Sequence, residues 1–564
     1  MMSKVVVSAF SLILVVGVVI GVVAVVQKSG NSEETLSTSS KNVASICQPT
    51  DYKEACEKSL GSVEDSSDPK EYLAAAILST MEAAKKAFNL SDSLIVKAGS
   101  SDNDTKMALE DCKSMLDDAV EELQDSFSSV GESDVHTMNK RVADLQNWLS
   151  AVITYQSTCL DDFGDPNSEY KTEMKDGMLD ANQLTSNALA IVNGLSKILS
   201  SFGLKLDADN DSNNHSRRLL SMGDDGYPDW YSGSGRRLFA TQDISTIKPN
   251  ITVAQDGSGD VKTIMEALGK LPPKYDGQYI VHVKAGVYKE YVSVGKKMHN
   301  VFMYGDGPLK TVVSGDRSNK TGFKTMRTCT FEALGEGFTA RSMGFENTAG
   351  AEGHQAVALR VQSDRAAFFD CKIDGYQDTL YVHAHRQFYN NCTVSGTIDF
   401  IFGNAACVIQ NSLIVANRGM PGQFNTVTAQ GRTEKHQTTG LVLQNCKFIA
   451  EDKLFPDRLT TMLSYLGRPW KEFSRAVIME SDITDVIHPD GWLPWNGDLY
   501  LSTLDYMEYA NTGAGAAPGK RVKWVKIVTD KAKVIPFTVD PFIQGAEWLN
   551  ETNHAVFVPG LIKP

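Results

Sequence analysis

The chain has 564 residues, of which 42% are hydrophobic and 22% charged, and its net charge is −14. This length exceeds that of an ordinary single domain, so at least two folded units are expected. The charge is uneven, about −15 over residues 1–240 and about +1 over residues 241–564, and neither part has the basic excess typical of nucleic-acid binding.

An apolar run opens the chain, from Val5 to Val26, after Lys4. Its 22 residues are long enough to span a bilayer and exceed the usual apolar core of a signal peptide. No small-x-small cleavage site follows, so residues 1–30 are either a signal peptide or a signal anchor. Both interpretations send the rest of the chain into the secretory pathway, and membrane contact is expected through this segment alone.

Two further features fit secretion. Asn-x-Ser/Thr sites support it weakly, because such triplets also arise by chance; they are Asn89, Asn103, Asn210, Asn214, Asn250, Asn319, Asn391 and Asn550. In an oxidising compartment four of the nine cysteines can form two disulfides, and the other five leave at least one thiol free unless it pairs between chains. The four are Cys47, Cys56, Cys112 and Cys159, and the five are Cys329, Cys371, Cys392, Cys407 and Cys446.

Residues 45–204 carry a helical pattern. Apolar side chains recur with a period near 3.6, for example at Leu145, Leu149 and Val152. Four or so such helices predict an all-α four-helix bundle, which taken alone indicates only a structural domain.

Residues 205–240 are predicted to be a solvated linker, because Gly, Asp and Asn dominate the segment. It contains two dibasic tetrads, the first formed by Arg217, Arg218, Leu219 and Leu220, the second by Arg236, Arg237, Leu238 and Phe239. These tetrads are either ordinary solvated charge or recognition sites for a processing protease.

Residues 241–564 have a different sequence pattern, in which short runs of β-branched and aromatic residues alternate with turns rich in Gly, Asn and Asp. An internal repeat is present, since Cys371 and Cys392 lie 21 residues apart, as do Gly375 and Gly396. A strand-rich repeat of this length predicts an all-β solenoid whose coils stack on one another.

The repeat also offers a reason for two carboxylates in unusual settings, Asp378 in a turn and Asp399 in an apolar run. Gln355, Gln377 and Asp399 are spaced by 22 residues, which predicts one residue per coil and a ladder of side chains about 4.8 Å apart. Because Asp378 lies beside the middle rung, two carboxylates and two amides are expected to meet.

Such a cluster has two interpretations. Adjacent carboxylates acquire separated pKa values, so an Arg468 paired with Asp399 would keep that residue anionic and nucleophilic while Asp378 acts as an acid. Gln355 and Gln377 would donate hydrogen bonds to a developing oxyanion, and a neighbouring Trp470 would stack on a sugar. The alternative is a polar ladder that only stabilises the coils.

Other catalytic machinery is missing from the sequence. The chain has no G-x-S-x-G nucleophile elbow and no phosphate-binding loop of the G-x-x-x-x-G-K-[ST] type. His383 and His385 share one side of a predicted strand, but without a third ligand they are interpreted as surface or core histidines rather than zinc ligands.

The motifs together identify a family. Residues 247–563 resemble the plant pectin methylesterases along their whole length, and residues 45–204 resemble the pectin methylesterase inhibitor domain, including the spacing of its four cysteines. The stretches that match the esterases are, in order, AQDGSGDVKTIMEAL, KAGVYKE, FENTAG, HQAVALR, DGYQDTLY, DFIFGNA, TAQGR, LGRPW, GWLPWNG and EYANTGAGA.

The resemblance implies a right-handed parallel β-helix for residues 241–564. It implies hydrolysis of the C6 methyl esters of homogalacturonan to carboxylate and methanol, without metal or cofactor. Asp399 matches the nucleophile, Asp378 the acid/base and Gln377 the oxyanion donor. The positions that match substrate-binding residues are Thr325, Gln355, Arg468 and Trp470.

The inhibitor-like region has implications of its own. Its family pairs the four cysteines in order, which implies the disulfides Cys47–Cys56 and Cys112–Cys159. The two dibasic tetrads become processing signals for a subtilisin-like protease, and the product is expected in the plant cell wall (apoplast). Besides methyl-esterified pectin, the expected partners are the chain's own pro-domain or separate inhibitor proteins.

One departure from the family pattern concerns the cysteines. Many members carry a Cys where this chain has Ser412, commonly paired with the Cys that matches Cys392. Here Cys407 lies nearby in sequence, so Cys392 either pairs with Cys407 or stays free. The nearly neutral charge of residues 241–564 also leaves open how tightly they adhere to anionic pectin.

The alternative functions are a glycosidase or lyase acting on the same polymer and a non-catalytic inhibitor. A β-helical glycosidase also uses two carboxylates, about 5–9.5 Å apart, and a lyase would need a base and an acidic Ca²⁺ cluster that is not evident. A non-catalytic inhibitor would have no use for the Asp378, Asp399, Gln377 and Arg468 set. Released methanol distinguishes the esterase from all of these.

Overall fold

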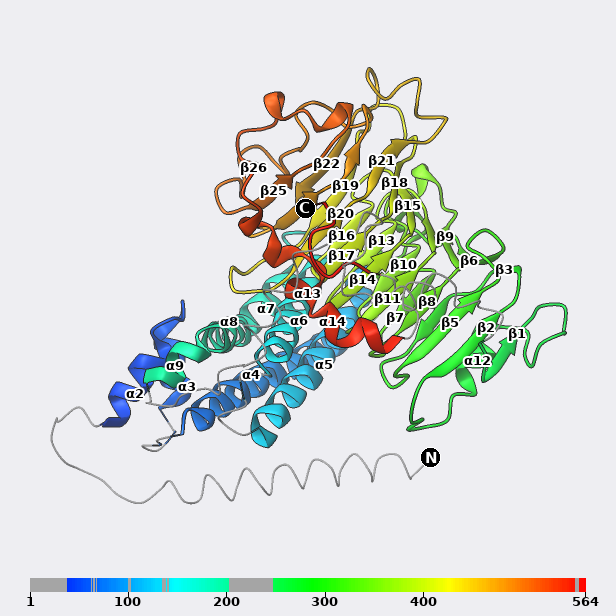
Figure 1. The fold of residues 1–564 in the computed structure, drawn as a ribbon. Coiled ribbons are helices and arrows are strands. Elements are labelled where there is room, and N and C mark those ends of the chain that lie inside the picture. The colour runs from blue at the N-terminus through cyan, green and yellow to red at the C-terminus, as the bar shows by residue number, and fades with distance from the viewer. Residues whose placement is uncertain are drawn as a thin grey trace, which may run out of the picture.

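A computed structural model describes residues 38–201 except 62, 64–65, 67, 100–102, 134–137 and 139–140, and residues 247–563 except 553–556. The N-terminal apolar run and the linker with both dibasic tetrads lie outside the described residues. Within the described part, none of the helices combines the length and apolar character needed to cross a bilayer. Figure 1 shows a helical domain packed against a long β-domain.

The helical domain begins at Thr38, earlier than the predicted residue 45, and its four longest helices pack as a bundle. The helix over Pro69–Ala98 begins where Asp68 accepts a hydrogen bond from the backbone N–H of Lys70 and Pro69 takes the first helical position, both strong start signals. The helices are α2 (Thr38–Cys47), α3 (Lys53–Leu60), α4 (Pro69–Ala98), α5 (Asn103–Glu132), α6 (Val142–Asp161), α7 (Glu169–Gly177), α8 (Leu179–Asn193) and α9 (Leu195–Ser201).

Two disulfides hold this domain together. Cys47–Cys56 joins α2 to α3, and Cys112–Cys159 joins α5 to α6, the pairing that the resemblance implies. The other five cysteines are thiols. Cys392 is therefore unpaired, and its backbone N–H donates to Ser412 Oγ at the position where many relatives carry a Cys.

The β-domain consists of three parallel sheets that run side by side along one axis. The eleven-stranded sheet contains β1 (Ile251–Val253), β2 (Tyr279–Val283), β5 (Val301–Gly305), β8 (Thr339–Arg341), β11 (Ala366–Phe369), β14 (Arg386–Asn390), β17 (Ala406–Gln410), β20 (Gly440–Gln444), β23 (Arg475–Met479), β25 (Asp505–Tyr509) and β26 (Lys526–Val528). The seven-stranded sheet contains β4 (Val292–Val294), β7 (Phe331–Ala333), β10 (Leu359–Val361), β13 (Leu380–Val382), β16 (Ile401–Gly403), β19 (Asn425–Gln430) and β22 (Ser464–Pro469). The eight-stranded sheet contains β3 (Gly286–Tyr288), β6 (Thr311–Gly315), β9 (Gly344–Asn347), β12 (Lys372–Asp374), β15 (Thr393–Gly396), β18 (Leu413–Ala416), β21 (Lys447–Ala450) and β24 (Asp482–Ile483).

Successive coils stack in register, as the repeat predicts. Leu359, Leu380 and Ile401 face one another across β10, β13 and β16, which makes these coils 21 residues long. Side chains that point inward therefore meet their equivalents one coil away, and the Phe368 and Tyr389 rings stack with centroids 4.8 Å apart. The predicted β-solenoid is confirmed as a three-sheet parallel β-helix.

Amide side chains form a ladder at the turn between the eleven- and eight-stranded sheets. Asn391 Nδ2 donates to Asp370 Oδ1 at 2.7 Å, and Asn445 Nδ2 donates to Asn411 Oδ1 at 2.8 Å. All four residues have φ between 51° and 55°, the left-handed region that Asn and Asp tolerate best. A polar ladder that stabilises the coils is thus present, but away from Asp378 and Asp399.

The ends and outer faces of the β-helix are covered. The short helix α12 (Ile264–Gly269) begins with a Thr263–Glu266 capping box and buries its apolar side in the first coil. The C-terminal helices α13 (Val539–Ile543) and α14 (Gly545–Trp548) cover outward-facing apolar residues of the eleven-stranded sheet. The outer face of the seven-stranded sheet is covered by the helical domain, whose core extends to Met326 and Ala384.

Candidate active site

A cavity of about 290 Å³ lies between the outer face of the seven-stranded sheet and the helical domain. All seven residues predicted from the sequence to act in catalysis or substrate binding line it. They are Thr325, Gln355, Gln377, Asp378, Asp399, Arg468 and Trp470.

The register corrects the predicted ladder by one residue. The backbone N–H of Asp378 donates to Ile398 O, which continues the pairing of Leu380 with Ile401. Asp378, and not Gln377, is therefore in register with Asp399, because the coil step here is 21 rather than 22 residues. Both carboxylates stand at the start of neighbouring strands, with φ of 64° and 51°.

Asp399 is held by three hydrogen bonds to its side chain. Arg468 Nε donates to Oδ1 at 2.8 Å and Arg468 Nη2 donates to Oδ2 at 2.6 Å. Thr426 Oγ donates to Oδ1 at 2.6 Å and accepts from the Asp399 backbone N–H. Such a bidentate guanidinium pair forms two charge-assisted hydrogen bonds and fixes the orientation of the carboxylate.

Asp378 has the opposite environment. Its side chain is buried and forms no ion pair among the described residues. Burial, reinforced by the nearby Asp399 charge, raises the pKa of Asp378 well above its usual range, and Arg468 offsets this only in part. The two carboxylates thus have different environments, one paired with a guanidinium and one buried without an ion pair, which is the arrangement expected of a nucleophile beside an acid.

The cavity floor is aromatic. Tyr381 of β13 and Phe402 of β16 stack with ring centroids 4.3 Å apart, and Trp470 meets Phe402 edge-on at 6.1 Å. Because equivalent positions of neighbouring coils stack, the repeat builds a flat apolar platform that suits the face of a sugar ring. Gln355 and Gln377 supply amide groups at its edge.

Two residues of this site are not singled out by the sequence. Thr426 is the second residue of β19, belongs to no motif quoted above, and is identified only through its contacts with Asp399. Trp495 lines the cavity, and the Arg468 guanidinium carbon lies 4.3 Å from its ring centroid. The GWLPWNG stretch contains Trp495 and was the available signal for it.

The helical domain itself contributes to the cavity through the end of α6. Thr158, Asp161 and Asp162 line it, and Asp161 forms an ion pair with Lys471. Asp162 Oδ2 is buried without a hydrogen-bond partner among the described residues. Burial, with Asp111 and Asp161 nearby, raises the pKa of Asp162 to about 8.

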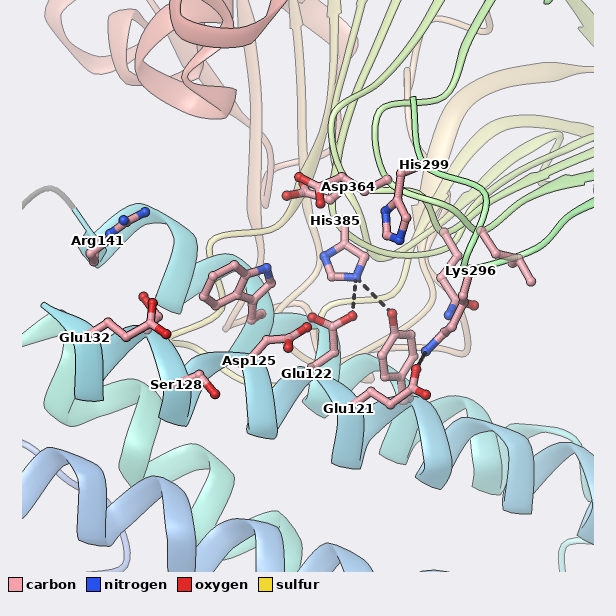
Figure 2. A pocket seen from close by; sticks show the side chains of 16 residues that line it. Glu121, Glu122, Asp125, Ser128, Glu132, Arg141, Lys296, His299, Asp364 and His385 are labelled. Atoms are coloured by element: carbon pink, nitrogen blue, oxygen red, sulfur yellow. Dashed lines mark hydrogen bonds and ion pairs between the residues drawn. The ribbon is translucent and has the colours of Figure 1, made fainter. Parts of the chain in front are cut away.

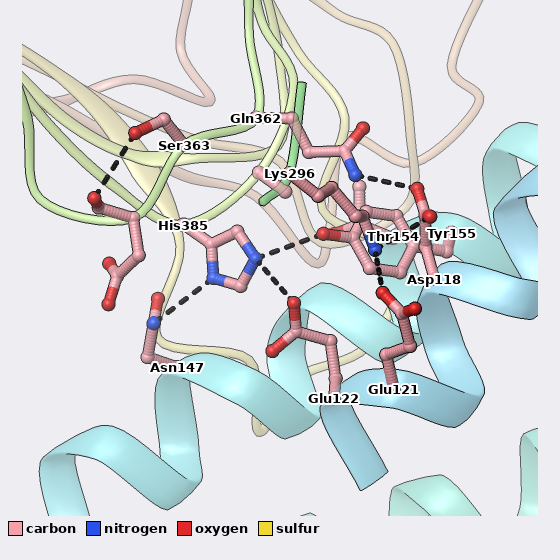
Figure 3. A network of polar contacts seen from close by, with 12 residues as sticks. Asp118, Glu121, Glu122, Asn147, Thr154, Tyr155, Lys296, Gln362, Ser363 and His385 are labelled. Atoms are coloured by element: carbon pink, nitrogen blue, oxygen red, sulfur yellow. Dashed lines mark hydrogen bonds and ion pairs between the residues drawn. The ribbon is translucent and has the colours of Figure 1, made fainter. Parts of the chain in front are cut away.

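His383 and His385 were expected at the surface or in the core, and the structure instead places both at the domain interface. His383 Nε2 hydrogen-bonds with Thr158 Oγ at 2.9 Å. His385 Nε2 lies 2.9 Å from Tyr155 Oη and 3.1 Å from Glu122 Oε1, as Figure 3 shows. Both imidazoles are therefore engaged by the helical domain, a role that a strand pattern alone could not reveal.

A second interdomain cavity, of about 410 Å³, lies beside His385 (Figure 2). Acidic side chains of α5 such as Glu121, Glu122 and Asp125 face Lys296 and His299 of the β-helix across it. It contains none of the predicted catalytic residues, so the smaller cavity is the candidate active site.

One group of possible metal ligands exists among the described residues. Asp51, Glu434 and His436 lie close enough to share an ion at the edge of the interface. Lys435 already forms an ion pair with Asp51 at 2.6 Å, and none of the three lines the cavity around Asp378 and Asp399.

Comparisons with known families match both domains. Residues 250–546 match the model described as Pectinesterase, and residues 41–191 match the model described as Plant invertase/pectin methylesterase inhibitor.

Similar proteins span the whole chain. "Probable pectinesterase/pectinesterase inhibitor 13" of Arabidopsis thaliana is 44% identical over 92% of this chain and 82% of its own length. "Pectinesterase 4" of the same plant is 40% identical over 99% of this chain and all of its own length.

A solved structure matches the β-helix. "Pectin methylesterase from Carrot" is 49% identical, with a TM-score of 0.55, over 56% of this chain and 99% of its own. Residues 247–563 make up that same share of the present chain, so the carrot chain corresponds in extent to the β-helix without a helical domain. A β-helix of this kind is therefore stable without a helical domain.

Proposed function

The chain belongs to the pectinesterase family and carries a pectin methylesterase inhibitor-like domain, and from this premise we propose that Asp399, Asp378 and Gln377 hydrolyse the methyl ester. The reaction class is carboxylic ester hydrolysis, and the substrate is methyl-esterified pectin. The observation that carries the assignment is the Arg468–Asp399 pair beside a buried Asp378 of raised pKa.

In the first step Asp399 attacks the C6 carbonyl carbon. The carbonyl oxygen gains negative charge, and an amide N–H of Gln377, with Gln355 nearby, stabilises it. The tetrahedral intermediate then collapses, the bond to the methoxy oxygen breaks, and Asp378 gives its proton to the departing methanol. The product of this step is an acyl-enzyme, an anhydride of Asp399.

In the second step Asp378 is the base. It removes a proton from water, which attacks the acyl carbon, and the tetrahedral intermediate releases the free galacturonate carboxylate. Asp399 returns to its ionised, Arg468-paired state and Asp378 is protonated again. Thr325, Trp470 and the Tyr381–Phe402 platform would hold the sugar during both steps.

We further propose that the helical domain silences the enzyme while it is attached. Support comes from the end of α6, because Thr158, Asp161 and Asp162 line the same cavity as Asp378 and Asp399. A polymer chain could not enter a space that these side chains occupy. Separate inhibitor proteins of the same family would be expected to bind this face in the same way.

Processing would relieve the block. Cleavage by a subtilisin-like protease after Leu220 or Phe239 would release residues 241–564 intact, and both tetrads lie outside the described residues. The apolar run Val5–Val26 would direct the chain into the secretory pathway and then to the cell wall, with residues 45–204 as pro-domain and 205–240 as the processing linker.

The experiment is methanol release from highly methylated pectin by the full chain and by residues 240–564, each with and without Asp399→Asn. Methanol from residues 240–564, loss of it in Asp399→Asn, and little from the full chain are the expected results. Shortened or unsaturated polymer without methanol would point to a glycosidase or lyase and refute the assignment. Equal rates in both lengths would refute the silencing role alone.

A further inference from the structure

Two of the five thiols in the β-helix occupy the same position of neighbouring coils. Cys371 directly precedes β12 and Cys392 directly precedes β15, and these strands pair with Lys372 opposite Thr393. The backbone N–H of Thr393 donates to Cys371 O at 2.9 Å, which continues this register to the two cysteines. Cys371 and Cys392 are therefore direct neighbours across one coil step.

The two side chains face the same interior space. Both belong to the hydrophobic core of the β-helix and are almost completely buried. The Cys392 thiol donates to Phe368 O at 3.5 Å, a carbonyl of the coil that contains Cys371, so this sulfur leans toward its neighbour. Burial raises the pKa of the Cys392 thiol, and a hydrogen bond with the Cys371 side chain raises it further. This hydrogen bond requires the two sulfurs to lie close together.

The next positions of this column separate the remaining thiols. The N–H groups of the following residues donate to Cys392 O at 2.8 Å and to Ser412 O at 2.9 Å, so Ser412 and then Cys446 continue the column. Ser412 therefore lies between Cys392 and Cys446. Cys407 belongs to β17, and its neighbours across the sheet are not cysteines. Among the described residues, Cys371 and Cys392 are the one pair of thiols at matching positions of adjacent coils.

Both residues are thiols in the structure, and their spacing suits a disulfide. Stacked strands lie about 4.8 Å apart, and disulfides span Cα separations of about 4.4–6.8 Å. Joining the sulfurs therefore needs rotation of the side chains and no shift of the backbone. The helical domain already contains two disulfides. Such bonds form in oxidising compartments, so an oxidant is available to this pair as well.

We propose that Cys371 and Cys392 form a third disulfide of this protein, which cross-links the two coils that carry the catalytic carboxylates. Asp378 follows Cys371 by seven residues, and Asp399 follows Cys392 by seven residues. The cross-link thereby fixes the register on which the meeting of Asp378 and Asp399 depends. The inference rests on the proposed function only in the roles of these two carboxylates.

The bond forms while the chain folds, because both thiols are inaccessible afterwards. The oxidant is the disulfide of a thiol–disulfide oxidoreductase. The thiolate of one cysteine attacks that disulfide, which breaks its S–S bond and gives a mixed disulfide, and the thiolate of the other cysteine then displaces the oxidoreductase sulfur. The two cysteines lose two protons and two electrons in total, and the oxidoreductase leaves as a dithiol.

The test counts the thiols of the full chain, secreted from a eukaryotic cell and denatured without reductant. Three thiols are expected from the five cysteines outside the disulfides of the helical domain. Cys371→Ala should give four thiols, because it removes one cysteine and frees Cys392. The matched control is Cys446→Ala, a buried position of the same column, which should give two. Mass spectrometry of the unreduced digest should find the Cys371 and Cys392 peptides linked.

Melting temperatures of the full chain give a second readout. Cys371→Ala, Cys392→Ala and the double variant should each lower the melting temperature of the β-helix by about 4–8 °C, since either change breaks the same bond. If the two thiols were separate, the effects of the single variants would add in the double variant.

Five titratable thiols in the unsubstituted chain would overturn the proposal, as would a linked peptide that joins Cys392 to Cys407. Additive losses of melting temperature would also contradict it. A chain that contains the cross-link but releases no methanol from pectin after removal of the helical domain would count against the proposed function instead.

Discussion

At the residue scale, two chemically identical side chains are given different tasks by their surroundings. Asp399 is fixed by Arg468 and Thr426, while Asp378 lies buried beside it without a cation of its own. Burial penalises a charge that is not paired, so the unpaired carboxyl retains its proton. In the proposed mechanism, the surroundings of these two side chains thereby distinguish the nucleophile from the acid.

The contribution of Thr426 can be measured through an isosteric change. Thr426→Val removes the hydroxyl that bonds Asp399 Oδ1 at 2.6 Å, so the carboxylate loses one of the groups that orient it. We expect kcat on methylated pectin to fall about ten- to a hundredfold with little change in KM. Thr426→Ser restores the hydroxyl and should recover most of kcat. A Ser variant as slow as the Val variant would show that packing, not the hydrogen bond, is what matters.

Asp378 is predicted to cost stability at neutral pH. Its pKa is raised above the unfolded value of about 3.9, so its contribution is favourable only at low pH and is lost as the pH rises toward the folded pKa. Asp378→Asn should therefore raise the melting temperature of the full chain, in which the helical domain closes the cavity over this side chain, by about 1–3 °C at pH 7 and by less at pH 4, while residues 240–564 with the same change should lose activity.

The matched control is Asp399→Asn, which leaves the Arg468 charge without its partner and should lower the melting temperature. Calorimetry at the two pH values checks both variants. Equal destabilisation by the two changes would contradict the difference in environment described here.

At the element scale, the coil length controls which side chains meet. β13 and β16 follow one another after 21 residues, so the carboxylates at their starts stack, as do Tyr381 and Phe402 on their outer faces. The strands can approach this closely only where the backbone allows it. Gly403, which ends β16, has φ of 130°, and a Cβ there would lie 2.0 Å from Val382 O.

Gly403→Ala should consequently disturb the pairing of β16 with β13. We expect the free energy of unfolding of residues 240–564 to fall by about 2–4 kcal/mol, because backbone and not a flexible side chain blocks the new methyl group. Gly295→Ala is the control, since a Cβ there meets no atom within 4 Å, and it should change stability by less than about 0.5 kcal/mol. Denaturant unfolding gives both values, and equal effects would contradict the steric account.

At the scale of the whole molecule, the two domains meet through groups that titrate. Burial lowers the pKa of His385, but the Glu122 and Asp364 carboxylates together outweigh burial and leave the pKa raised. Burial and neighbouring carboxylates raise the pKa of Asp162 to about 8. Both groups bind protons more tightly when the domains are docked. Protonation therefore favours docking at a pH below the ordinary pKa values of these groups, and this contribution is lost as the pH rises through their raised pKa values. His383 has the opposite effect on docking, since burial and Arg360 lower its pKa. This effect operates only below about pH 6.5, where an unburied histidine would take up a proton.

Between about pH 6.5 and 8.5, where His383 stays neutral, the helical domain of the full chain should therefore dock less tightly on the β-helix. We expect the activity of the full chain, as a fraction of that of residues 240–564 at the same pH, to rise about tenfold across this window. Asp162→Asn should flatten the rise, whereas Asp176→Asn, an exposed change on α7, should not. A fraction that is constant or falls with pH would contradict the sign worked out here.

Much of this protein could be predicted from the sequence because its information is local or periodic. The 3.6-residue period defined the helical domain, the 21-residue spacing of Cys371 and Cys392 defined the coils, and motif resemblance gave the family and the seven residues of the cavity.

The tertiary structure decided what depends on contacts between distant segments. It moved the partner of Asp399 from Gln377 to Asp378, because register is set by backbone pairing rather than by residue identity. It also brought Thr426 and the end of α6 to the site and placed His385 at the domain interface, because no local pattern records which surfaces will meet.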